Sequence, residues 1–308
     1  MSEHIAVFTS PSGEAETMSS YQRVLDAWPV AHEQLWVETS FGKAFVMASG
    51  PENGEVVVLL HALFATAMSW YRNVEDLSKT YRTYCIDVIG EGNRSRPLRP
   101  ITSMDGFLEW FTEVLDGLGV ETAGLIGNSY GGFTAAYYAM KLPQRIRKLV
   151  LIGPASTIHS MRPFMLHMFI PKGLYLLLPR LPGIRRVMRR SVDWMHGGLP
   201  SDPLWEPLFY QTLVNGKLLN RVFPRVYTKA EFDQIEAPTL LILGEADRIY
   251  GHLAPVIESV GELMPHARIS VIPMAHHITG LSRPDLVNEE LLEFLAEEPA
   301  FTIKSQVE

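Results

Sequence analysis

The sequence predicts an α/β protein with a doubly wound, mostly parallel sheet, and three observations lead to this fold class. Short apolar runs without polar alternation, such as residues 56–60 and 239–243, are typical of strands buried on both faces of a sheet. Helical patterns separate the runs, and the clearest lies between residues 103 and 119. At residues 122–140, a strand passes through a Gly-x-Ser-x-Gly turn into a helical pattern. The alternation of strands and helices predicts helices on both faces of the sheet.

Composition sets the broad class of the protein. A length of 308 residues with 47% hydrophobic content suits one large domain, or a domain with an insertion. The 27 basic and 34 acidic residues give a net charge of −7, which argues against nucleic acid as a partner. The single cysteine, Cys85, lies in an apolar run and is interpreted as a core residue. Because residues 1–4 have neither a basic start nor a long apolar region, we expect no signal peptide and a cytoplasmic location.

The chain outside residues 155–232 divides into short elements. Residues up to about Thr17 are polar and are expected to be loose, and a short amphipathic helix is expected over 21–28. The next two expected strands, 35–39 and 42–48, look like a hairpin because a turn signal separates them. The remaining expected elements are strands at 55–61, 81–88, 122–127, 148–152, 239–243 and 267–272, and helices at 70–77 and 103–118.

Residues 155–232 interrupt the alternation of strands and helices. This segment is rich in Met, Leu, Pro and aromatic residues, so we interpret it as a helical cap over the ligand edge of the sheet. The predicted organisation is therefore a core formed by 1–154 and 233–308 with a cap at 155–232. Apolar residues at 164–178 are broken by His, Pro and Lys, and are too few to cross a membrane, so no stable membrane insertion is expected.

A basic amphipathic helix is possible inside the cap. Arginines alternate there with apolar residues, a pattern that membrane-surface helices use. The acidic balance of the whole chain favours a solvated cap face over membrane contact, and both interpretations stay open. The arginines are Arg180, Arg185, Arg186, Arg189 and Arg190.

The turn at Ser129 has the features of a nucleophile elbow. A serine on a tight turn between a strand and a helix has a strained backbone, so the residues two before and two after it must be nearly free of side chain. Gly127 and Gly131 meet this requirement. The motif is short and common, but an apolar strand precedes it and a helical pattern follows it, as the elbow requires.

An activated serine also needs a base and a buried carboxylate. In doubly wound sheets these groups lie on loops beyond the carboxyl ends of strands. Residues 244–248, after the strand at 239–243, offer Glu245 and Asp247. Residues 273–277, after the last strand, offer His276 and His277. The chain order is therefore serine, acid, histidine.

This order, together with the elbow, resembles the α/β-hydrolase superfamily. Residues 59–62 are similar to the strand that ends in His-Gly in that family, with Ala62 in place of the glycine. Residues 87–95 resemble its Asp-x-x-Gly-x-Gly-x-Ser loop with one extra residue, and residues 241–247 resemble its acid loop. His277 precedes Pro284 by seven residues, as in the histidine segment of the family. The resemblance covers about 35–295 and is nearest to the capped carboxylesterase branch.

The resemblance implies a role for each residue of the site. Ser129 would be the nucleophile, Asp247 the carboxylate and His277 the base, with Glu245 and His276 as the competitors of the last two. Because the family uses two backbone N–H groups as an oxyanion hole, Leu63 and Tyr130 are the expected donors.

These features together predict a serine carboxylesterase that cleaves small to medium hydrophobic carboxylic esters through an acyl-enzyme. The Met-rich cap favours an apolar substrate, and neither a metal nor an organic cofactor is expected. Two alternatives remain: a carbon–carbon bond hydrolase with the same three residues, and a receptor for a small hydrophobic signal with slow hydrolysis. The expected partner is a small ester, not nucleic acid, and the sequence predicts no oligomeric state.

Overall fold

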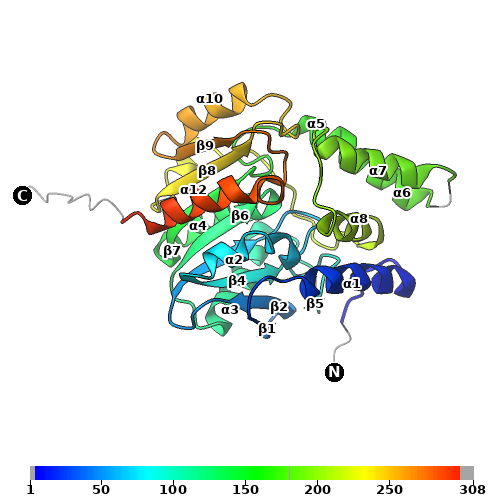
Figure 1. The fold of residues 1–308 in the computed structure, drawn as a ribbon, viewed down its shortest axis with the longest axis horizontal. Coiled ribbons are helices and arrows are strands. Elements are labelled where there is room, and N and C mark those ends of the chain that lie inside the picture. The colour runs from blue at the N-terminus through cyan, green and yellow to red at the C-terminus, as the bar shows by residue number, and fades with distance from the viewer. Residues whose placement is uncertain (1–3, 180, 299–308) are drawn as a thin grey trace, which may run out of the picture.

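A nine-stranded sheet forms the centre of the molecule (Figure 1). The computed structural model describes residues 4–179 and 181–298. Along the sheet the strands follow the order β1-β2-β4-β3-β6-β7-β8-β9, and β5 pairs with β2. The strands are β1 (His32–Thr39), β2 (Gly42–Ser49), β3 (Glu55–Leu60), β4 (Tyr81–Asp87), β5 (Arg96–Pro97), β6 (Ala123–Asn128), β7 (Ile146–Ile152), β8 (Thr239–Gly244) and β9 (Arg268–Ile272).

The strand directions agree with the fold class that the sequence predicts. β1 and β2 form the expected antiparallel hairpin, and β2 also runs antiparallel to β4. From β4 to β9 every neighbouring pair is parallel. Because a parallel sheet must be covered on both faces, its central strands are mainly apolar and fully buried. The doubly wound, mostly parallel α/β architecture is confirmed.

Helices pack in two groups around the sheet. α3 contacts α4, while α12 contacts α2, and Figure 1 shows α12 crossing in front of the strands. α3 begins after Ser103, whose hydroxyl accepts a hydrogen bond from the N–H of Gly106, as an N-cap does. The helices of the core are η1 (Ala67–Trp70), α2 (Val74–Leu77), α3 (Met104–Gly117), α4 (Tyr130–Lys141), η2 (Pro143–Arg145), α9 (Lys229–Phe232), α10 (Ala254–Leu263), α11 (Thr279–Ser282) and α12 (Pro284–Ala296).

The N-terminal segment differs from its expected structure. The prediction that residues up to Thr17 are loose is wrong, because helix α1 spans Pro11–Asp26. Ser10 caps it by accepting a hydrogen bond from the N–H of Gly13, and Pro11 occupies the first turn, where it costs no hydrogen bond. The helix expected at 70–77 is also divided, into η1 and α2.

Between β7 and β8 a helical insertion extends beyond the carboxyl edge of the sheet, on the right of Figure 1. Its two ends meet, because the N–H of Tyr227 donates a 3.0 Å hydrogen bond to the carbonyl oxygen of Thr157. The helix α1 packs against α8 of this insertion. The helices of the insertion are α5 (Arg162–Phe164), η3 (Met165–Phe169), α6 (Ile170–Leu177), α7 (Ile184–Met195) and α8 (Trp205–Asn215).

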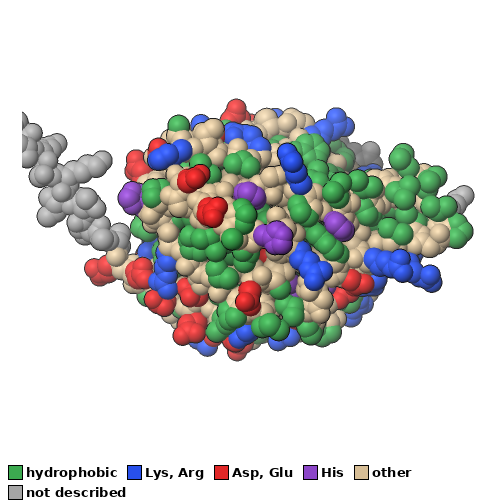
Figure 2. Space-filling view, turned by 90° about the horizontal axis from the view of Figure 1, so that it is seen from above, with side chains coloured by type: hydrophobic (Ala, Val, Ile, Leu, Met, Phe, Trp, Pro, Cys, Tyr) green, Lys and Arg blue, Asp and Glu red, His purple; other side chains and the backbone are tan. Residues whose placement is uncertain are grey.

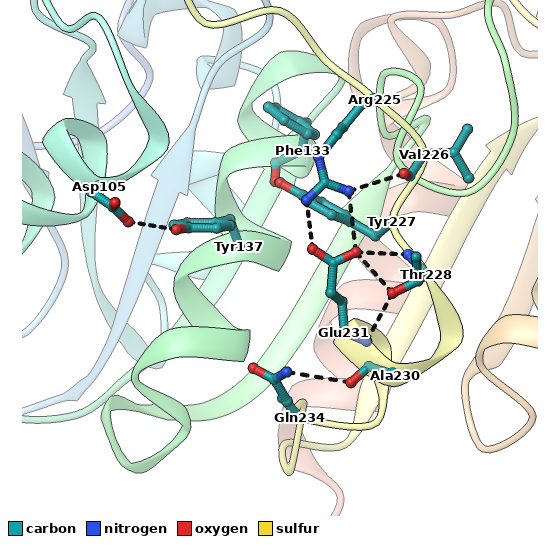
Figure 3. Close-up of polar contacts among 10 residues, drawn as sticks. All are labelled: Asp105, Phe133, Tyr137, Arg225, Val226, Tyr227, Thr228, Ala230, Glu231 and Gln234. Carbon is teal, nitrogen blue, oxygen red and sulfur yellow. Dashed lines mark hydrogen bonds and ion pairs between the residues drawn. The ribbon is translucent and has the colours of Figure 1, made fainter.

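The chain returns from the insertion through a polar junction (Figure 3). Two guanidinium nitrogens of Arg225 donate hydrogen bonds to the carboxylate of Glu231, 2.5 and 3.1 Å long. Thr228 and Glu231 form a capping box that starts α9. These bonds lower the pKa of Glu231 to about 2, chiefly through Arg225. The junction lies at the end of the segment 155–232, whose boundaries as a separate cap stay a prediction.

None of the helices formed by residues 4–179 and 181–298 combines the length and apolar character that a membrane crossing requires.

Candidate functional site

Ser129 lies directly after β6, at the carboxyl edge of the sheet. Its φ angle is 52°, an unusual value for a residue with a side chain. A Cβ atom on Gly127 would lie 2.3 Å from the carbonyl oxygen of Gly131, and one on Gly131 would lie 2.2 Å from that of Leu60. The two glycines are therefore required, because only their lack of side chain lets the turn close against β3.

A chain of two hydrogen bonds joins Ser129 to Asp247 through His277. Nε2 of His277 lies 2.9 Å from the hydroxyl oxygen of Ser129, and its Nδ1 lies 2.9 Å from Oδ2 of Asp247. An ionised carboxylate only accepts hydrogen bonds, so Nδ1–H is the donor to Asp247 and Nε2 is free to accept the serine proton. All three side chains are buried.

The loop after β8 places Asp247 toward His277 and Glu245 away from it. The N–H of Ile249 donates a 2.9 Å hydrogen bond to Oδ1 of Asp247, which leaves Oδ2 for the imidazole. Gly153 makes room for the pair, because a Cβ atom there would lie 3.3 Å from both side chains. Glu245 is exposed and accepts a hydrogen bond from the N–H of Met274, whereas the ring nitrogens of His277 bond to Asp247 and Ser129.

His276 is buried beside the hydrogen-bonded chain without joining it. Its Nδ1 accepts a 3.2 Å hydrogen bond from the N–H of Ile278, and its ring centre lies 4.8 Å from that of His196. Burial, together with His196 and His277, lowers the pKa of His276 to about 3. His276 is therefore uncharged at neutral pH and packs as a neutral ring.

His61 connects the ends of β3 and β4. Its Nδ1 lies 2.8 Å from the carbonyl oxygen of Ala62, and its Nε2 accepts a 2.9 Å hydrogen bond from the N–H of Val88. Burial lowers the pKa of His61 to about 4, so the ring is neutral and donates from Nδ1 to Ala62. This histidine fixes the turn that leads to Leu63.

Leu63 and Tyr130 border the same cavity as Ser129 and His277. Tyr130 is the first residue of α4, where an N–H group has no partner inside the helix. The cavity has a free volume of about 20 Å³. Its remaining walls are largely apolar and include Met161, Phe164, Phe169, Met195 and Phe209 from the insertion.

A buried carboxyl group that the sequence analysis did not single out holds the loop after β3. Oε2 of Glu91 accepts a 3.1 Å hydrogen bond from the N–H of Phe64, the residue after Leu63. Phe64 has a φ angle of 61°, which is strained for an aromatic residue. Burial, and to a smaller extent Asp87, raises the pKa of Glu91 to about 8, so its carboxyl is protonated at neutral pH.

The insertion holds Phe64 from the other side. The hydroxyl of Thr212, in α8, donates a hydrogen bond to the carbonyl oxygen of Phe64. Lys172, in α6, donates to the carbonyl oxygens of Leu213 and Gly216, and its ammonium lies 5.7 Å from the centre of the Phe64 ring. Burial lowers the pKa of Lys172 to about 8. The loop at Leu63 is thus fixed jointly by the core and the insertion.

The described ranges, 4–179 and 181–298, place no group of three or more His, Cys, Asp or Glu side chains where they could share a metal ion.

Several known proteins are similar to this chain over most of its length. The family described as alpha/beta hydrolase fold matches residues 55–284. Carboxylesterase YbfK of Bacillus subtilis is 33% identical over 287 residues, which cover 90% of this chain and 92% of the relative. The crystal structure of carboxylesterase CesB (YbfK) from the same organism aligns with a TM-score of 0.82 at 29% identity, over 94% of this chain and 100% of that one.

A second solved structure, naproxen esterase (carboxylesterase NP) from Bacillus subtilis, aligns with a TM-score of 0.80 at 27% identity. The alignment covers 93% of this chain and 99% of the esterase. The similarities extend across nearly the whole of each protein, so they concern the complete fold and not a shared motif. This chain belongs to the α/β-hydrolase fold family and is carboxylesterase-like within it.

Proposed function

We propose that the protein is a serine carboxylesterase whose nucleophile is Ser129, with His277 as general base and Asp247 as the carboxylate that orients it. The observation that carries this proposal is the buried chain of hydrogen bonds from Ser129 through His277 to Asp247. The carboxylesterase function itself, expected from the sequence, is supported by relatives of that name that match nearly the whole chain.

In the first half of the reaction, Oγ of Ser129 attacks the ester carbonyl carbon while Nε2 of His277 takes the hydroxyl proton. Asp247 stabilises the imidazolium through Nδ1–H. Backbone N–H groups of Leu63 and Tyr130 would bind the negative oxygen of the tetrahedral intermediate. The intermediate then expels the alcohol, which receives the proton from His277. An acyl group remains on Ser129.

Water completes the cycle on the acyl-enzyme. His277 takes a proton from the water molecule as it attacks the acyl carbon, and the second intermediate collapses with return of that proton to Ser129. The carboxylic acid leaves and the site is restored. Each half therefore uses the same base and the same two N–H donors.

The cavity beside Ser129 favours a small to medium hydrophobic ester. Its free volume of about 20 Å³ is too small for such a substrate, so side chains of the insertion must shift when one binds. The thioethers of Met161 and Met195 are suited to this, because methionine changes shape at little cost.

The same lining is unfavourable for the carbon–carbon bond hydrolase. Such an enzyme, acting on a carboxylate-bearing diketone, would need a cationic or strongly polar group in the insertion. Among the described residues that border the cavity there is no Arg or Lys.

Two further expectations from the sequence stay predictions: the cytoplasmic location of the protein, and the assignment of residues 155–232 as a separate cap.

The direct test is hydrolysis of p-nitrophenyl acetate, butyrate and octanoate by the wild type and by Ser129→Ala. We expect turnover by the wild type and a fall to the background rate in the variant. Intact-protein mass spectrometry would detect the acyl group on Ser129 during turnover. Full activity in Ser129→Ala would contradict the assignment of Ser129 as the nucleophile. A stable acyl adduct that is not released would instead support the alternative of a receptor for a small hydrophobic signal, with slow hydrolysis.

A further inference from the structure

The insertion carries a row of apolar side chains that face solvent. Leu166, Ile170 and Leu177 are 59%, 60% and 80% exposed. Their spacing places them along one side of the helical run from η3 to α6. The exposed apolar residues of this surface, which we call the outer face of the insertion, are Met165, Leu166, Ile170, Leu174, Leu176, Leu177, Leu178, Leu181 and Val187.

Positive charge accompanies this apolar row. A shallow groove of about 250 Å³ runs between α6 and α7, and its walls combine Leu174, Leu181 and Val187 with Arg186 and Arg190. Figure 2 shows apolar side chains gathered on the projecting part of the molecule, with basic side chains along one side of it. Apolar side chains and guanidinium groups therefore share one surface.

The arginines of the groove have no acidic partner in the part of the chain that the structure describes. Arg189 forms an ion pair with Glu206, but Arg186 and Arg190 form none within those residues. The one carboxylate of α7, Asp193, is in its last turn. Of the other arginines of the pattern, Arg185 is exposed, and Arg180 lies outside the described residues. The net charge of −7 is thus distributed unevenly, with a local basic surface on the insertion.

We propose that the outer face of the insertion docks on the surface of an anionic phospholipid membrane. The apolar row would enter the region between headgroups and acyl chains, while Arg186 and Arg190 bind lipid phosphates. Helices that lie in the plane of a membrane surface present apolar residues beside basic ones, as this surface does. An apolar patch of this extent with a charged rim is uncommon on a protein without an interaction partner.

A second copy of the chain is a poorer occupant of this surface. A two-fold dimer brings each patch against itself, so the arginine pairs of the two copies would be brought into one interface. Like charges in an interface weaken association. A membrane surface instead supplies phosphates, whose charge is complementary to these side chains.

The helical run that carries the outer face of the insertion also contributes walls to the cavity beside Ser129. Phe164 and Phe169 line that cavity, whereas Leu166 and Ile170, on the same helical run, face outward. A docked insertion would therefore place the cavity walls next to the lipid phase, where hydrophobic esters are concentrated. Docking itself involves no ester chemistry, so it can be measured separately from hydrolysis.

The test is co-sedimentation of the full chain with vesicles at low salt. One set contains phosphatidylglycerol and phosphatidylcholine, and the other phosphatidylcholine alone. We expect the protein to bind the anionic set, and 0.5 M NaCl to weaken that binding by screening. Arg186→Gln/Arg190→Gln should lower the partition coefficient roughly 30-fold, because each basic residue contributes about a factor of five. Leu166→Ser/Leu177→Ser should lower it roughly tenfold or more.

Matched controls separate the outer face of the insertion from general charge and hydrophobicity. Arg96→Gln/Lys141→Gln removes two exposed positive charges outside the insertion, and Val271→Ser removes an exposed apolar side chain from β9. Both should bind as the wild type does. Circular dichroism checks that each variant is folded.

Three results would overturn the proposal. One is that the wild type does not sediment with anionic vesicles. Another is that the arginine and leucine variants bind as tightly as the controls. The last is that sedimentation velocity finds a dimer that Leu166→Ser/Leu177→Ser dissociates, since a second copy then covers this face.

Discussion

The hydroxyl oxygen of Ser129 lies 2.9 Å from Nε2 of His277 although 148 residues separate them in the chain. The contact forms because β6 and β9 end at the same edge of one parallel sheet. A serine at a strand end becomes a nucleophile only if a base is brought within hydrogen-bond reach. The proposed site therefore depends on the order of the strands as much as on the identity of the residues.

Asp247→Asn should lower kcat by roughly 10³–10⁴-fold, because the amide favours the wrong imidazole tautomer and does not stabilise its cation. Glu245→Gln is the matched control, since the two residues share one loop and only Asp247 is hydrogen-bonded to His277. We expect the control to stay within about twofold of the wild type. Steady-state kinetics with p-nitrophenyl butyrate measures both. A large loss in the control and a small one in Asp247→Asn would reverse the assignment.

The adjacent histidines should respond differently to the same substitution. His277→Gln removes the proposed base and should reduce turnover at least about 10³-fold. His276→Gln should keep most of the turnover, because His276 has no hydrogen bond to Ser129 or Asp247. Because His276 is buried, its variant should mainly lower the melting temperature. Comparing kcat with thermal unfolding for both variants distinguishes the two roles, and preserved kcat in His277→Gln would contradict the mechanism.

Glu91 should act on catalysis by positioning Leu63. Glu91→Ala removes the acceptor of the Phe64 N–H bond, so Leu63, the proposed oxyanion donor next to Phe64, loses its fixed position. We expect kcat to fall by roughly 10–100-fold with little change in KM. Glu91→Gln keeps an oxygen acceptor and should restore most of the rate at pH 7. Equal losses in both variants would rule out this hydrogen bond as the cause.

The protonation of Glu91 also predicts a dependence of stability on pH. Its pKa is about 8 in the folded protein and about 4.5 as the ordinary value, so the folded state holds the proton more tightly. Stability from this group is complete below pH 4.5 and is lost as the pH rises to about 8. Glu91→Gln has no such loss. Its melting temperature relative to the wild type should rise by roughly 6 °C between pH 5 and pH 9, because the proton that the folded wild type loses in this range contributes roughly 4 kcal/mol. A constant difference would contradict the raised pKa.

Thr212 tests whether the insertion supports the same loop. Thr212→Val keeps the shape of the side chain but removes the hydroxyl that donates to the carbonyl oxygen of Phe64. A hydrogen bond of this kind contributes about 1 kcal/mol, so we expect roughly a fivefold fall in kcat. Thr212→Ser should recover the rate. If Thr212→Ser does not recover the rate, the loss in Thr212→Val comes from altered packing and not from the missing hydrogen bond.

Much of the fold could be predicted because buried parallel strands have a distinctive sequence pattern. Strands such as β3 and β8 are apolar after their first residue, and their predicted limits agree with the structure to within one residue. The start of α1 was missed because its first turn is polar and is stabilised by the Ser10 cap rather than by an apolar face. At the division within 70–77 lies Asn73, whose side chain donates a hydrogen bond to Asn288, a contact that the local sequence does not reveal.

Residues of the candidate site could be predicted from the sequence only where a local sequence rule exists. The turn at Ser129 needs glycines at fixed positions, and this requirement is visible in the sequence. Glu91 has no comparable signal, because a carboxyl group becomes buried and protonated only through residues brought close by folding. The same is true of Lys172 and Thr212, whose partners are set by the packing of α6 and α8.

The hydrogen bond between Tyr227 and Thr157 closes the neck of the insertion, and this has a consequence for how the enzyme can diversify. Residues 158–226 leave and re-enter the core at one point, so their length and sequence can change while the path of the sheet stays the same. Longer excursions cost little extra closure entropy. Much of the apolar wall of the cavity beside Ser129 thus belongs to a segment that can be exchanged, whereas the hydrogen-bonded chain from Ser129 to Asp247 belongs to the framework of strands beneath it.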